Sequence, residues 1–117
     1  DDELHVDGIR VISEVITVES TELLRTTSDW LRDKIHSGVI GLGATVNGNP
    51  MIIITVSDDV IKKGVNAGEL IKSVSKMIGG GGGGRPNSAQ AGGKDNSKLE
   101  EAVKTIPNLI SAAIKTQ

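Results

Sequence analysis

The sequence predicts a single α/β domain in which helices flank a small mixed β-sheet. Segments rich in Val and Ile alternate along the chain with segments whose apolar residues recur at helical spacing, and short turn-forming stretches separate them. At 117 residues the chain is long enough to bury one core, and a second domain is not expected. We therefore expect the order strand, helix, hairpin, helix, strand, helix over residues 1–117.

The first predicted strand and helix occupy the N-terminal third of the chain. Residues 8–18 are rich in Val and Ile and have no polar face, which predicts a strand buried on both sides. Ser20 or Thr21 can cap a helix that runs to about residue 37, where Gly38 supplies the stop. The apolar stripe of this helix comprises Leu24, Leu31 and Ile35, widened by Leu23 and Trp30.

A hairpin is predicted next. Residues 39–46 alternate, with Ile40, Leu42, Ala44 and Val46 on one face, and residues 51–56 form an uninterrupted apolar run. The intervening sequence Asn47-Gly48-Asn49-Pro50 is a strong turn signal, so we expect an antiparallel pair whose second strand is central. Gly41 and Gly43 on the other face would allow a helix or a ligand to lie close, or would only accommodate neighbouring side chains.

Two helices are predicted before the glycine-rich part of the chain. Ser57-Asp58-Asp59 opens a short helical turn that ends at Gly64. The two acids serve as caps, not as a catalytic pair, because neighbouring helical residues point in different directions. Asn66-Ala67-Gly68-Glu69 reads as a capping box for a second helix, which runs directly into the glycines.

The C-terminal part is predicted to hold one strand and two helical pieces. Residues 88–91 have small side chains that fit a crowded short strand. Ser97 begins another capping box, followed by apolar residues at helical spacing. We expect a break near residues 105–106, with Pro107 as the first residue of a final helix.

The most unusual segment is residues 79–93. Six glycines, Gly79–Gly84, lead into Arg85-Pro86, and the segment closes with Gly92-Gly93. Glycine adopts positive φ without steric cost and lets a backbone lie directly against another surface, so we expect a loop that points several amides at an anion. The run follows a helix instead of opening one, and no Gly-Lys-Ser or Gly-Lys-Thr is present, so nucleotide hydrolysis by a P-loop is not supported.

Charge is divided unevenly along the chain. Residues 1–60 contain eleven acids and four bases, whereas residues 61–117 contain four acids and nine bases. The cation-rich half holds the glycines and points to an anionic partner such as nucleic acid, although two solvated helix faces would give the same count. Trp30 is the only aromatic residue, and we expect it in the core, the alternative being stacking on an unpaired base. If RNA binds, phosphate and shape should dominate its recognition.

Composition argues against several other classes. The chain has no cysteine and only His5 and His36, so we expect no disulfide, no metal site and no cofactor in this domain. No apolar stretch approaches the roughly 20 residues of a membrane span, so we expect a soluble protein of the cytoplasm or an organelle. The start, Asp1-Asp2-Glu3, lacks a methionine and suggests a segment of a longer protein.

The chain also resembles a known family over most of its length. The resemblance rests on Gly79–Gly84, Arg85-Pro86, Ala89-Gln90-Ala91-Gly92-Gly93, Lys94-Asp95 and, upstream, Lys63-Gly64, Ala67-Gly68 and Leu70-Ile71-Lys72. These elements are similar to the signature of the DHHA1 domain that ends alanyl-tRNA synthetases, the C-Ala domain. The resemblance implies a non-catalytic module that binds alanine-specific tRNA and helps hold it between the aminoacylation and editing sites. The other domains of a parent synthetase and a second copy of the chain are further expected partners.

On this interpretation the glycine loop lies flat against the outer surface of the tRNA, with backbone amides and Arg85 meeting phosphates. Arg85 could equally fasten the loop to the body through a salt bridge. Gln90 and Asn87 could read a base edge or a 2′-hydroxyl, or could fasten the loop. The predicted tRNA-binding set is Lys63, Lys72, Lys76, Gly80, Gly81, Gly82, Gly83, Gly84, Arg85, Asn87, Gln90 and Lys94, with no catalytic and no metal-ligating residue.

Two other functions remain open at this point. The domain could serve oligomerisation or packing against other domains of its own synthetase, without direct RNA contact. It could also be the related DHHA1 domain that ends DHH phosphoesterases, although Gly84-Arg85-Pro86 stands where those proteins typically carry a histidine after the glycines, and their metal-binding motif is absent from this chain.

Overall fold

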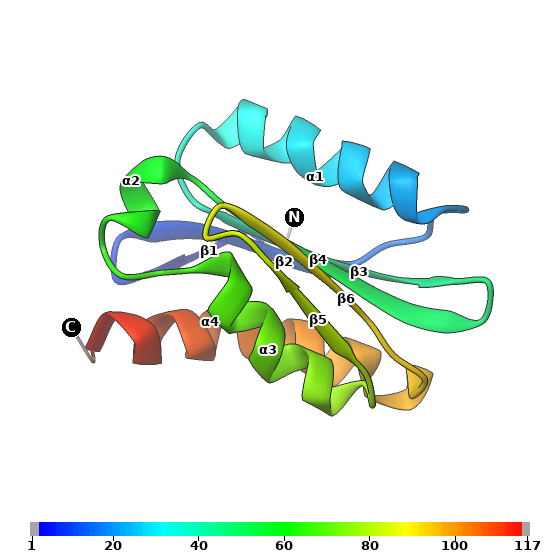
Figure 1. Cartoon of the computed structure of the whole chain (residues 1–117). Coiled ribbons are helices and arrows are strands. Elements are labelled where there is room, and N and C mark those ends of the chain that lie inside the picture. Colours follow the sequence, from blue (N-terminus) through cyan, green and yellow to red (C-terminus); the bar gives the residue numbers. More distant parts are fainter. Residues whose placement is uncertain (1–2, 116–117) are drawn as a thin grey trace.

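A computed structural model describes residues 3–115 and shows a six-stranded mixed sheet between two layers of helices. Helix α1 covers one face of the sheet, and helices α3 and α4 lie on the other face (Figure 1). The predicted α/β architecture of a small mixed sheet flanked by helices is confirmed. The elements are β1 (Glu3–Val6), β2 (Ile9–Val15), α1 (Thr21–Ile35), β3 (Val39–Val46), β4 (Asn49–Val56), α2 (Asp58–Ile61), α3 (Ala67–Met77), β5 (Gly81–Gly84), β6 (Ser88–Gly92), a 3₁₀ turn (Asn96–Lys98) and α4 (Leu99–Lys115).

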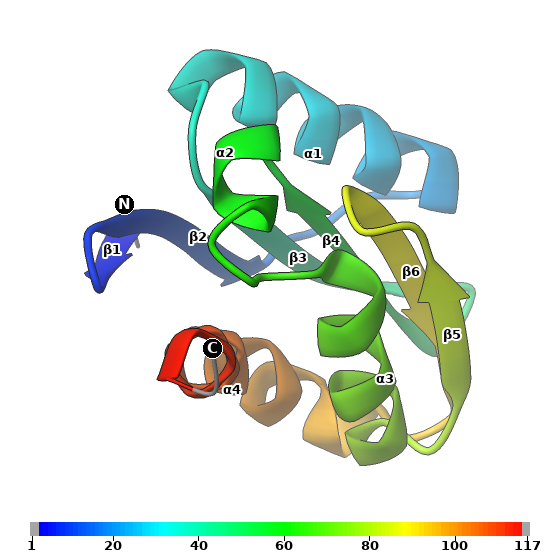
Figure 2. The same ribbon diagram turned by 60° about the vertical axis from the view of Figure 1, so that its left-hand side comes forward.

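The strands follow the spatial order β1-β2-β3-β4-β6-β5. Only β2 and β3 pair in parallel, because α1 connects them across one face, and the other four neighbouring pairs are antiparallel. Strand β4 is central, as predicted, and the turn at Asn47 and Gly48 has positive φ at both residues, 52° and 83°. The glycine-rich strand β5 forms one edge of the sheet (Figure 2).

Two apolar cores lie on the two faces of the sheet. The larger one joins the sheet to α3 and α4, and the smaller one joins it to α1. Gly41 and Gly43 of β3 face α4, where an added Cβ would stand 2.6 Å from Cδ1 of Ile106 and 2.7 Å from Cγ2 of Val103. These two glycines therefore accommodate side chains of α4, which was one of the predicted alternatives, and in doing so they let the helix lie against the sheet.

Strand β1 was not predicted. It pairs with β2 through a turn at Asp7 and Gly8, both with positive φ, 51° and 83°. An Asp-Gly pair before an apolar strand is a hairpin signal, so this element was predictable from the sequence. The segment predicted as a strand over residues 8–18 forms β2 and is buried on both faces only in its first half, through Val11 and Ile12, whereas Val15 is 42% exposed. Asp1 and Asp2 lie outside the described residues.

Helix α1 begins as predicted and ends slightly earlier than expected. The hydroxyl of Ser20 accepts from the backbone N–H of Leu23 at 3.1 Å. The helix ends at Ile35, and His36, at a φ of 64°, caps it instead of Gly38. Leu23 and Trp30, which were expected to widen the buried stripe, are 47% and 59% exposed, so placing them in the core was wrong.

Helix α4 runs without a break through Pro107, contrary to the predicted interruption. A proline inside a helix removes the N–H that would bond to the carbonyl four residues earlier, here that of Val103. The hydroxyl of Ser13 in β2 donates to this carbonyl at 2.5 Å. The sheet thus satisfies the acceptor that the proline leaves without its helical partner, and the helix continues.

The caps of the last two helices differ in how well they were predicted. Asn66 accepts from the N–H of Glu69 at 3.2 Å and opens α3, as expected. The final helix is preceded by a 3₁₀ turn capped by Asp95, whose carboxylate accepts from the N–H of Ser97 at 3.0 Å. The predicted cap at Ser97 was therefore displaced by two residues, because Asp95 is the acceptor that lies nearer the entry to this turn.

Candidate nucleic-acid interface

The glycine run forms a strand and not the predicted loop. Residues 81–84, strand β5, pair antiparallel with β6 in the register Gly81 to Gly92 and Gly84 to Ala89. All four glycines of β5 are exposed. Helix α1 packs against β3 and β4, so the β5–β6 hairpin extends past the part of the sheet that this helix covers (Figure 2). The hairpin therefore presents nearly bare backbone at an edge of the molecule.

Packing requires only alternate glycines in this run. A Cβ added at Gly80, Gly82 or Gly84 would stand 1.9, 2.4 or 2.5 Å from a carbonyl oxygen of β6, closer than real Cβ atoms come. A Cβ added at Gly81 or Gly83 would meet no atom within 4 Å. Glycine weakens a strand and gives it nothing to pack, so these two open positions are kept bare at a cost in stability. Their effect is to leave one face of β5 flat.

A two-residue turn closes the hairpin. The backbone N–H of Arg85 donates to Ser88 at 2.9 Å, and that of Ser88 donates back at 3.3 Å. Pro86 suits the first central position of such a turn because its φ is already near the required value. The carbonyl of Pro86 also accepts from the N–H of Ala67 at 2.8 Å, which ties the turn to the start of α3.

The pairing pattern shows which backbone groups of β5 remain outward. Arg85 and Ser88 exchange both hydrogen bonds, and such pairs recur at every second residue of an antiparallel ladder. Gly83 and Gly81 therefore point their N–H and carbonyl groups toward β6. The corresponding groups of Gly82 and Gly84 point away from β6, as edge-strand groups do, and the carbonyl of Gly84 lies beside the start of α3, 3.1 Å from a Cβ added at Gly68.

Beside the turn lies an open hollow of about 410 Å³ that is rich in hydrogen-bond donors. Two guanidinium groups line it, from Arg25 of α1 and from Arg85. Arg25 donates to Oε1 of Gln90, so the helix and the strand are linked across this hollow. No carboxylate belongs to its lining, which comprises Arg25, Gly83, Gly84, Arg85, Asn87, Ser88, Ala89 and Gln90. The local field is positive, which suits an anion.

Arg85 is not fastened by a salt bridge within the part of the chain that the structure describes, since none of the ion pairs found there involves it. The salt-bridge alternative for this residue was therefore wrong as far as the described acids are concerned. Gln90 does fasten an element, because it accepts from Arg25. Arg25 itself was missed by the sequence analysis, and no local pattern marks it, since only the folded structure brings this residue of α1 within reach of Gln90.

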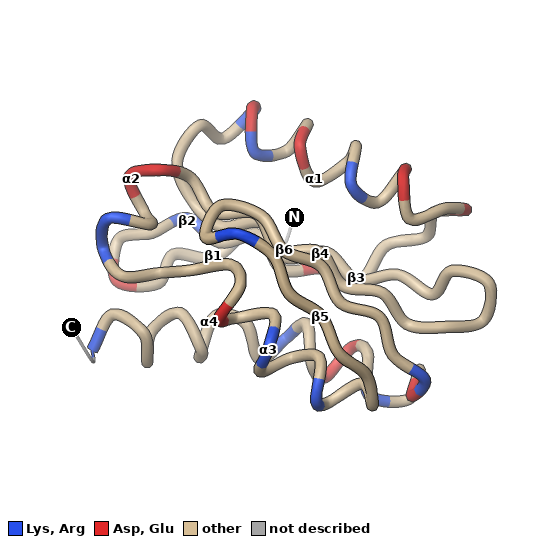
Figure 3. The backbone as a smooth tube through the Cα atoms, viewed as in Figure 1, with Lys and Arg blue, Asp and Glu red and all other residues tan. Residues whose placement is uncertain are grey.

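The four predicted lysines lie outside the hollow. Lys76, in the last turn of α3, and Lys94 flank the other end of β5, where the carbonyl of Lys76 accepts from Gly79 and the N–H of Lys94 donates to Ile78. Lys72, also on α3, forms an exposed ion pair with Glu69 at 3.7 Å. Lys63 lies in the turn between α2 and α3. Of the four lysines, only Lys76 and Lys94 lie at an end of the glycine strand, and the charged positions of α3 are visible beside it in Figure 3.

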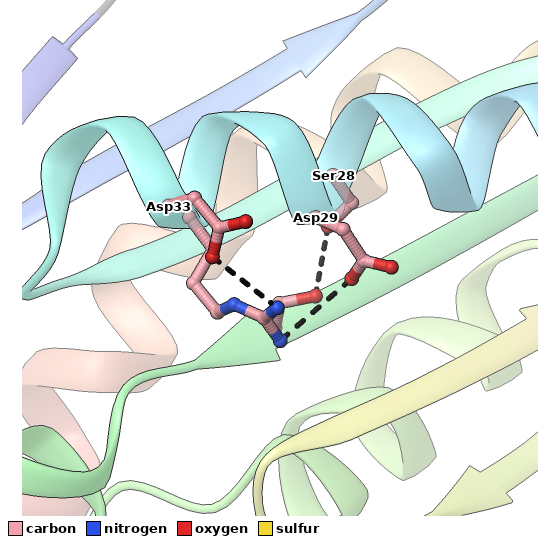
Figure 4. Close-up of polar contacts among 5 residues, drawn as sticks. Ser28, Asp29 and Asp33 are labelled. Atoms are coloured by element: carbon pink, nitrogen blue, oxygen red, sulfur yellow. Dashed lines mark hydrogen bonds and ion pairs between the residues drawn. The ribbon is translucent and has the colours of Figure 1, made fainter.

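A larger hollow of about 480 Å³ at the end of α1 is lined by one arginine, Arg32, and by two carboxylates, those of Asp33 and Asp58. Arg32 lines it and lies 3.7 Å from Asp29 and 3.5 Å from Asp33, and Figure 4 shows both carboxylates drawn toward one guanidinium. Beneath them, buried Ser28 shares a 2.8 Å hydrogen bond with Thr55 that fixes α1 to β4. Because its cation is compensated, this hollow is a poorer anion site than the one beside the turn.

Of the acidic pair of α2, Asp59 accepts hydrogen bonds from neighbouring hydroxyls, whereas no side-chain hydrogen bond caps the helix at its N-cap Ser57, so the predicted capping role is not seen for the pair. The carboxylate of Asp59 accepts from the hydroxyls of Ser37 and Ser57, and these bonds hold the pKa of Asp59 below its usual value. Ser57 in turn accepts from the N–H of Gly38 at 2.9 Å. The carboxylate is thus used to join α2 to the loop after α1. Among residues 3–115 no group of three His, Cys, Asp or Glu side chains is placed to hold a metal ion.

The fold and this surface define a layered α/β domain whose exposed sheet edge is a glycine hairpin flanked by arginines. The chain belongs to the DHHA1 domain family, which matches it over residues 8–112. Its structure is similar to that of the C-Ala domain from Aquifex aeolicus alanyl-tRNA synthetase, with a TM-score of 0.83 and 35% identity over 93% of this chain and 97% of that one. The family predicted from the sequence is therefore confirmed.

Curated relatives point the same way. The chain is 46% identical over 110 residues to the alanine–tRNA ligase of Desulfitobacterium hafniense, and 44% identical over 103 residues to that of Dehalococcoides mccartyi. These matches cover 94% and 88% of this chain but only 12% of each relative. A DHH-domain structure described as a member of the s1p family of ribosomal proteins matches with a TM-score of 0.59 at 14% identity, over 95% of this chain and 28% of that one, which shows the shared fold alone. Over the described residues, no helix is long and apolar enough to span a membrane.

Proposed function

We propose that this chain is the tRNA-binding C-terminal module of an alanine–tRNA ligase and helps hold alanine-specific tRNA for aminoacylation and editing. The observation that carries the proposal is the bare face of β5 at Gly81 and Gly83, where side chains would fit and none is present. Its position beside two arginines, with no carboxylate in the hollow, favours a polyanion as the group that lies on it. The similarity to alanyl-tRNA synthetases supports tRNA as this polyanion.

In this proposal β5 lies against the outer surface of the tRNA. Arg85 and Arg25 meet phosphate oxygens at the turn, and the outward N–H groups of Gly82 and Gly84 donate along the edge. Lys76 and Lys94 extend the positive field past the other end of the strand, Lys72 adds to it from within α3, and Lys63 lies in the turn that precedes α3. Contacts of this kind position the RNA without reading its sequence.

The shortage of aromatic residues supports recognition by backbone and shape. Trp30 is the chain's only aromatic side chain, and it stands exposed on α1 with the ammonium of Lys34 4.7 Å from the centre of its ring. Stacking of several bases on an aromatic platform is therefore not available to this domain. Activation of alanine and hydrolysis of mischarged tRNA are assigned to other domains of the proposed parent enzyme, which would work in the cytoplasm or an organelle.

The salt dependence of binding tests this proposal. Filter binding with a transcript of alanine tRNA over a series of salt concentrations should give a slope of log affinity against log salt of about −0.7 to −0.9 per phosphate contact. Arg85→Gln and Arg25→Gln should each lower the steepness by about one unit. Lys104→Gln is the matched control, since Lys104 lies on α4 and pairs with Glu100 at 3.8 Å. A flat salt response, or equal effects of all three variants, would count against the proposal.

A packing or oligomerisation role has one observation in its favour. An open groove of about 380 Å³ lies between α3 and α4, and it includes Leu70 and Leu109. Sedimentation of the chain with and without tRNA separates the two functions. A dimer that is indifferent to tRNA would favour packing, whereas a monomer that binds tRNA favours the main proposal.

A further inference from the structure

The contact between Arg25 and Gln90 determines which end of the glutamine amide faces the hollow. Arg25 comes from α1 and Gln90 from β6, 65 residues apart in the chain. A guanidinium carries only donors, so the amide atom that it contacts must be the oxygen Oε1. The amide nitrogen, with its two hydrogens, is then the group of Gln90 that remains for a ligand.

The side-chain groups that line this hollow are consequently biased toward donors. The guanidiniums of Arg25 and Arg85 donate only, and the fixed amide of Gln90 offers its NH₂ group. No carboxylate lies in the lining to accept a hydrogen bond. Asn87 differs from Gln90, because its side chain makes no hydrogen bond with the described residues and is free to turn either way.

We propose that Arg25 is a positioning residue that holds the Gln90 amide as a donor, and that the site thereby selects acceptor atoms on the bound RNA. This inference rests on the proposed function and deepens it. The matching group on the RNA is a phosphate oxygen or a base carbonyl, and an amino group at that place is rejected because it would face a second donor. The Arg25–Gln90 bond is exposed and contributes little to stability, so its main consequence is orientation.

Two isosteric changes separate this role from simple charge. Gln90→Glu keeps an oxygen toward Arg25 but replaces the NH₂ donor by a second carboxylate oxygen. Asn87→Asp adds the same charge to the same hollow, at an amide whose orientation is not fixed. With an alanine tRNA transcript, we expect Gln90→Glu to weaken binding at least tenfold more than Asn87→Asp does. We also expect the excess to persist at high salt, where the effect of charge is screened.

The role of Arg25 is tested by a double-mutant cycle with Gln90→Met. Arg25→Met should lower the affinity for RNA in the unmodified chain. If Arg25 acts through the amide, it should lower the affinity less in the Gln90→Met background, where only the loss of its positive charge remains. High salt should abolish this remaining effect. The side-chain NH₂ resonances of Gln90 should shift when RNA is added. Equal losses for Gln90→Glu and Asn87→Asp, an additive cycle or unmoved NH₂ resonances would each overturn the inference.

Chemical changes in the RNA distinguish the two acceptor sources. If the acceptor is a phosphate, one position that is sensitive to phosphorothioate substitution should become insensitive in Gln90→Met. If the acceptor is a base carbonyl, replacement of one guanosine by 2-aminopurine, which removes O6, should weaken binding to the unmodified chain. The same replacement should then have no effect on binding to Gln90→Met. Each of these two results would support a donor role for Gln90, and the absence of both would contradict it.

The same experiments separate failure of this inference from failure of the proposed function. If the unmodified chain does not bind the transcript, both fall. If it binds with a salt slope that Arg85→Gln reduces, yet Gln90→Glu equals Asn87→Asp, only the positioning role of Arg25 falls.

Discussion

Neighbouring glycines of β5 should respond in opposite ways to the same substitution. At Gly83 an added methyl group meets no atom within 4 Å, whereas at Gly82 it would stand 2.4 Å from the carbonyl oxygen of Gln90 and 2.6 Å from Cα of Ala91. Gly83→Ala should stabilise the fold by about 0.4–1 kcal/mol, because it restricts the unfolded chain. Gly82→Ala should destabilise it by about 1–3 kcal/mol, because backbone has to move to admit the methyl group.

Binding should separate from stability at the open positions. The variants Gly83→Val and Gly81→Val should fold well, because the added side chain meets open space. The same side chain should hold the RNA away from the strand. Loss of two backbone hydrogen bonds at about 0.5–1.5 kcal/mol each corresponds to a total of about 1–3 kcal/mol. On the scale of 1.4 kcal/mol for each tenfold change, affinity should fall by roughly five- to 150-fold.

Urea denaturation followed by circular dichroism measures the stability of Gly83→Ala and Gly82→Ala. Filter binding with alanine tRNA measures the affinity of Gly83→Val and Gly81→Val. The reasoning would be refuted by a Gly82→Ala variant as stable as Gly83→Ala, since the steric alternation would then be absent. It would be equally refuted by Gly83→Val binding tRNA with unchanged affinity, since the bare face would then have no role in contact.

Three further predictions concern the rest of the fold. Ser13→Ala should destabilise the chain by about 1–3 kcal/mol in urea denaturation, and by clearly less in a Pro107→Ala background, where the restored N–H can bond to Val103. In the folded chain the pKa of Asp59 lies below its unfolded value of about 3.9. Its contribution to the free energy of unfolding is therefore complete above that pH and is lost as the pH falls through the folded pKa. Asp59→Asn should reduce the loss of unfolding free energy between neutral and acid pH, measured by urea denaturation at several pH values. Trp30→Ala should change stability by less than about 0.5 kcal/mol, and the single-tryptophan fluorescence of the native chain should be that of a solvated indole; a larger loss or a blue-shifted emission would contradict the exposed position.

Local signals predicted most of the architecture. Hydrophobic periodicity located α1, α3 and the β3–β4 hairpin, and the caps at Ser20 and Asn66 lie where side-chain chemistry placed them. The missed strand β1 carried a readable signal, the Asp7-Gly8 turn. In each of these cases residues close in sequence supply both the pattern and the partner, so no tertiary information is needed.

Other features depend on partners far away in the sequence. Pro107 was expected to break a helix, and it does not, because Ser13 from β2 satisfies the carbonyl that the proline leaves. Trp30 was expected inside because it borders the apolar stripe of α1, but the residues of this helix that are buried are Leu24, Ser28 and Ile35, and Trp30 is 59% exposed. Arg25 has no sequence signal as a site residue, because its role depends on Gln90, which lies on another element.

By itself the sequence determined the α/β class, the order of its main elements and the DHHA1 family, because periodicity, caps and the ordered motif after the glycines are all local. Only the tertiary structure decided that the glycines form an edge strand. Pairing with β6 places their alternate Cβ positions against backbone or in open space, and no local rule distinguishes Gly82 from Gly83. The glycines, Arg85, Asn87 and Gln90 were readable in the chain as site residues, whereas Arg25 joined them, and the geometry of the site arose, only when β5, β6 and α1 came together.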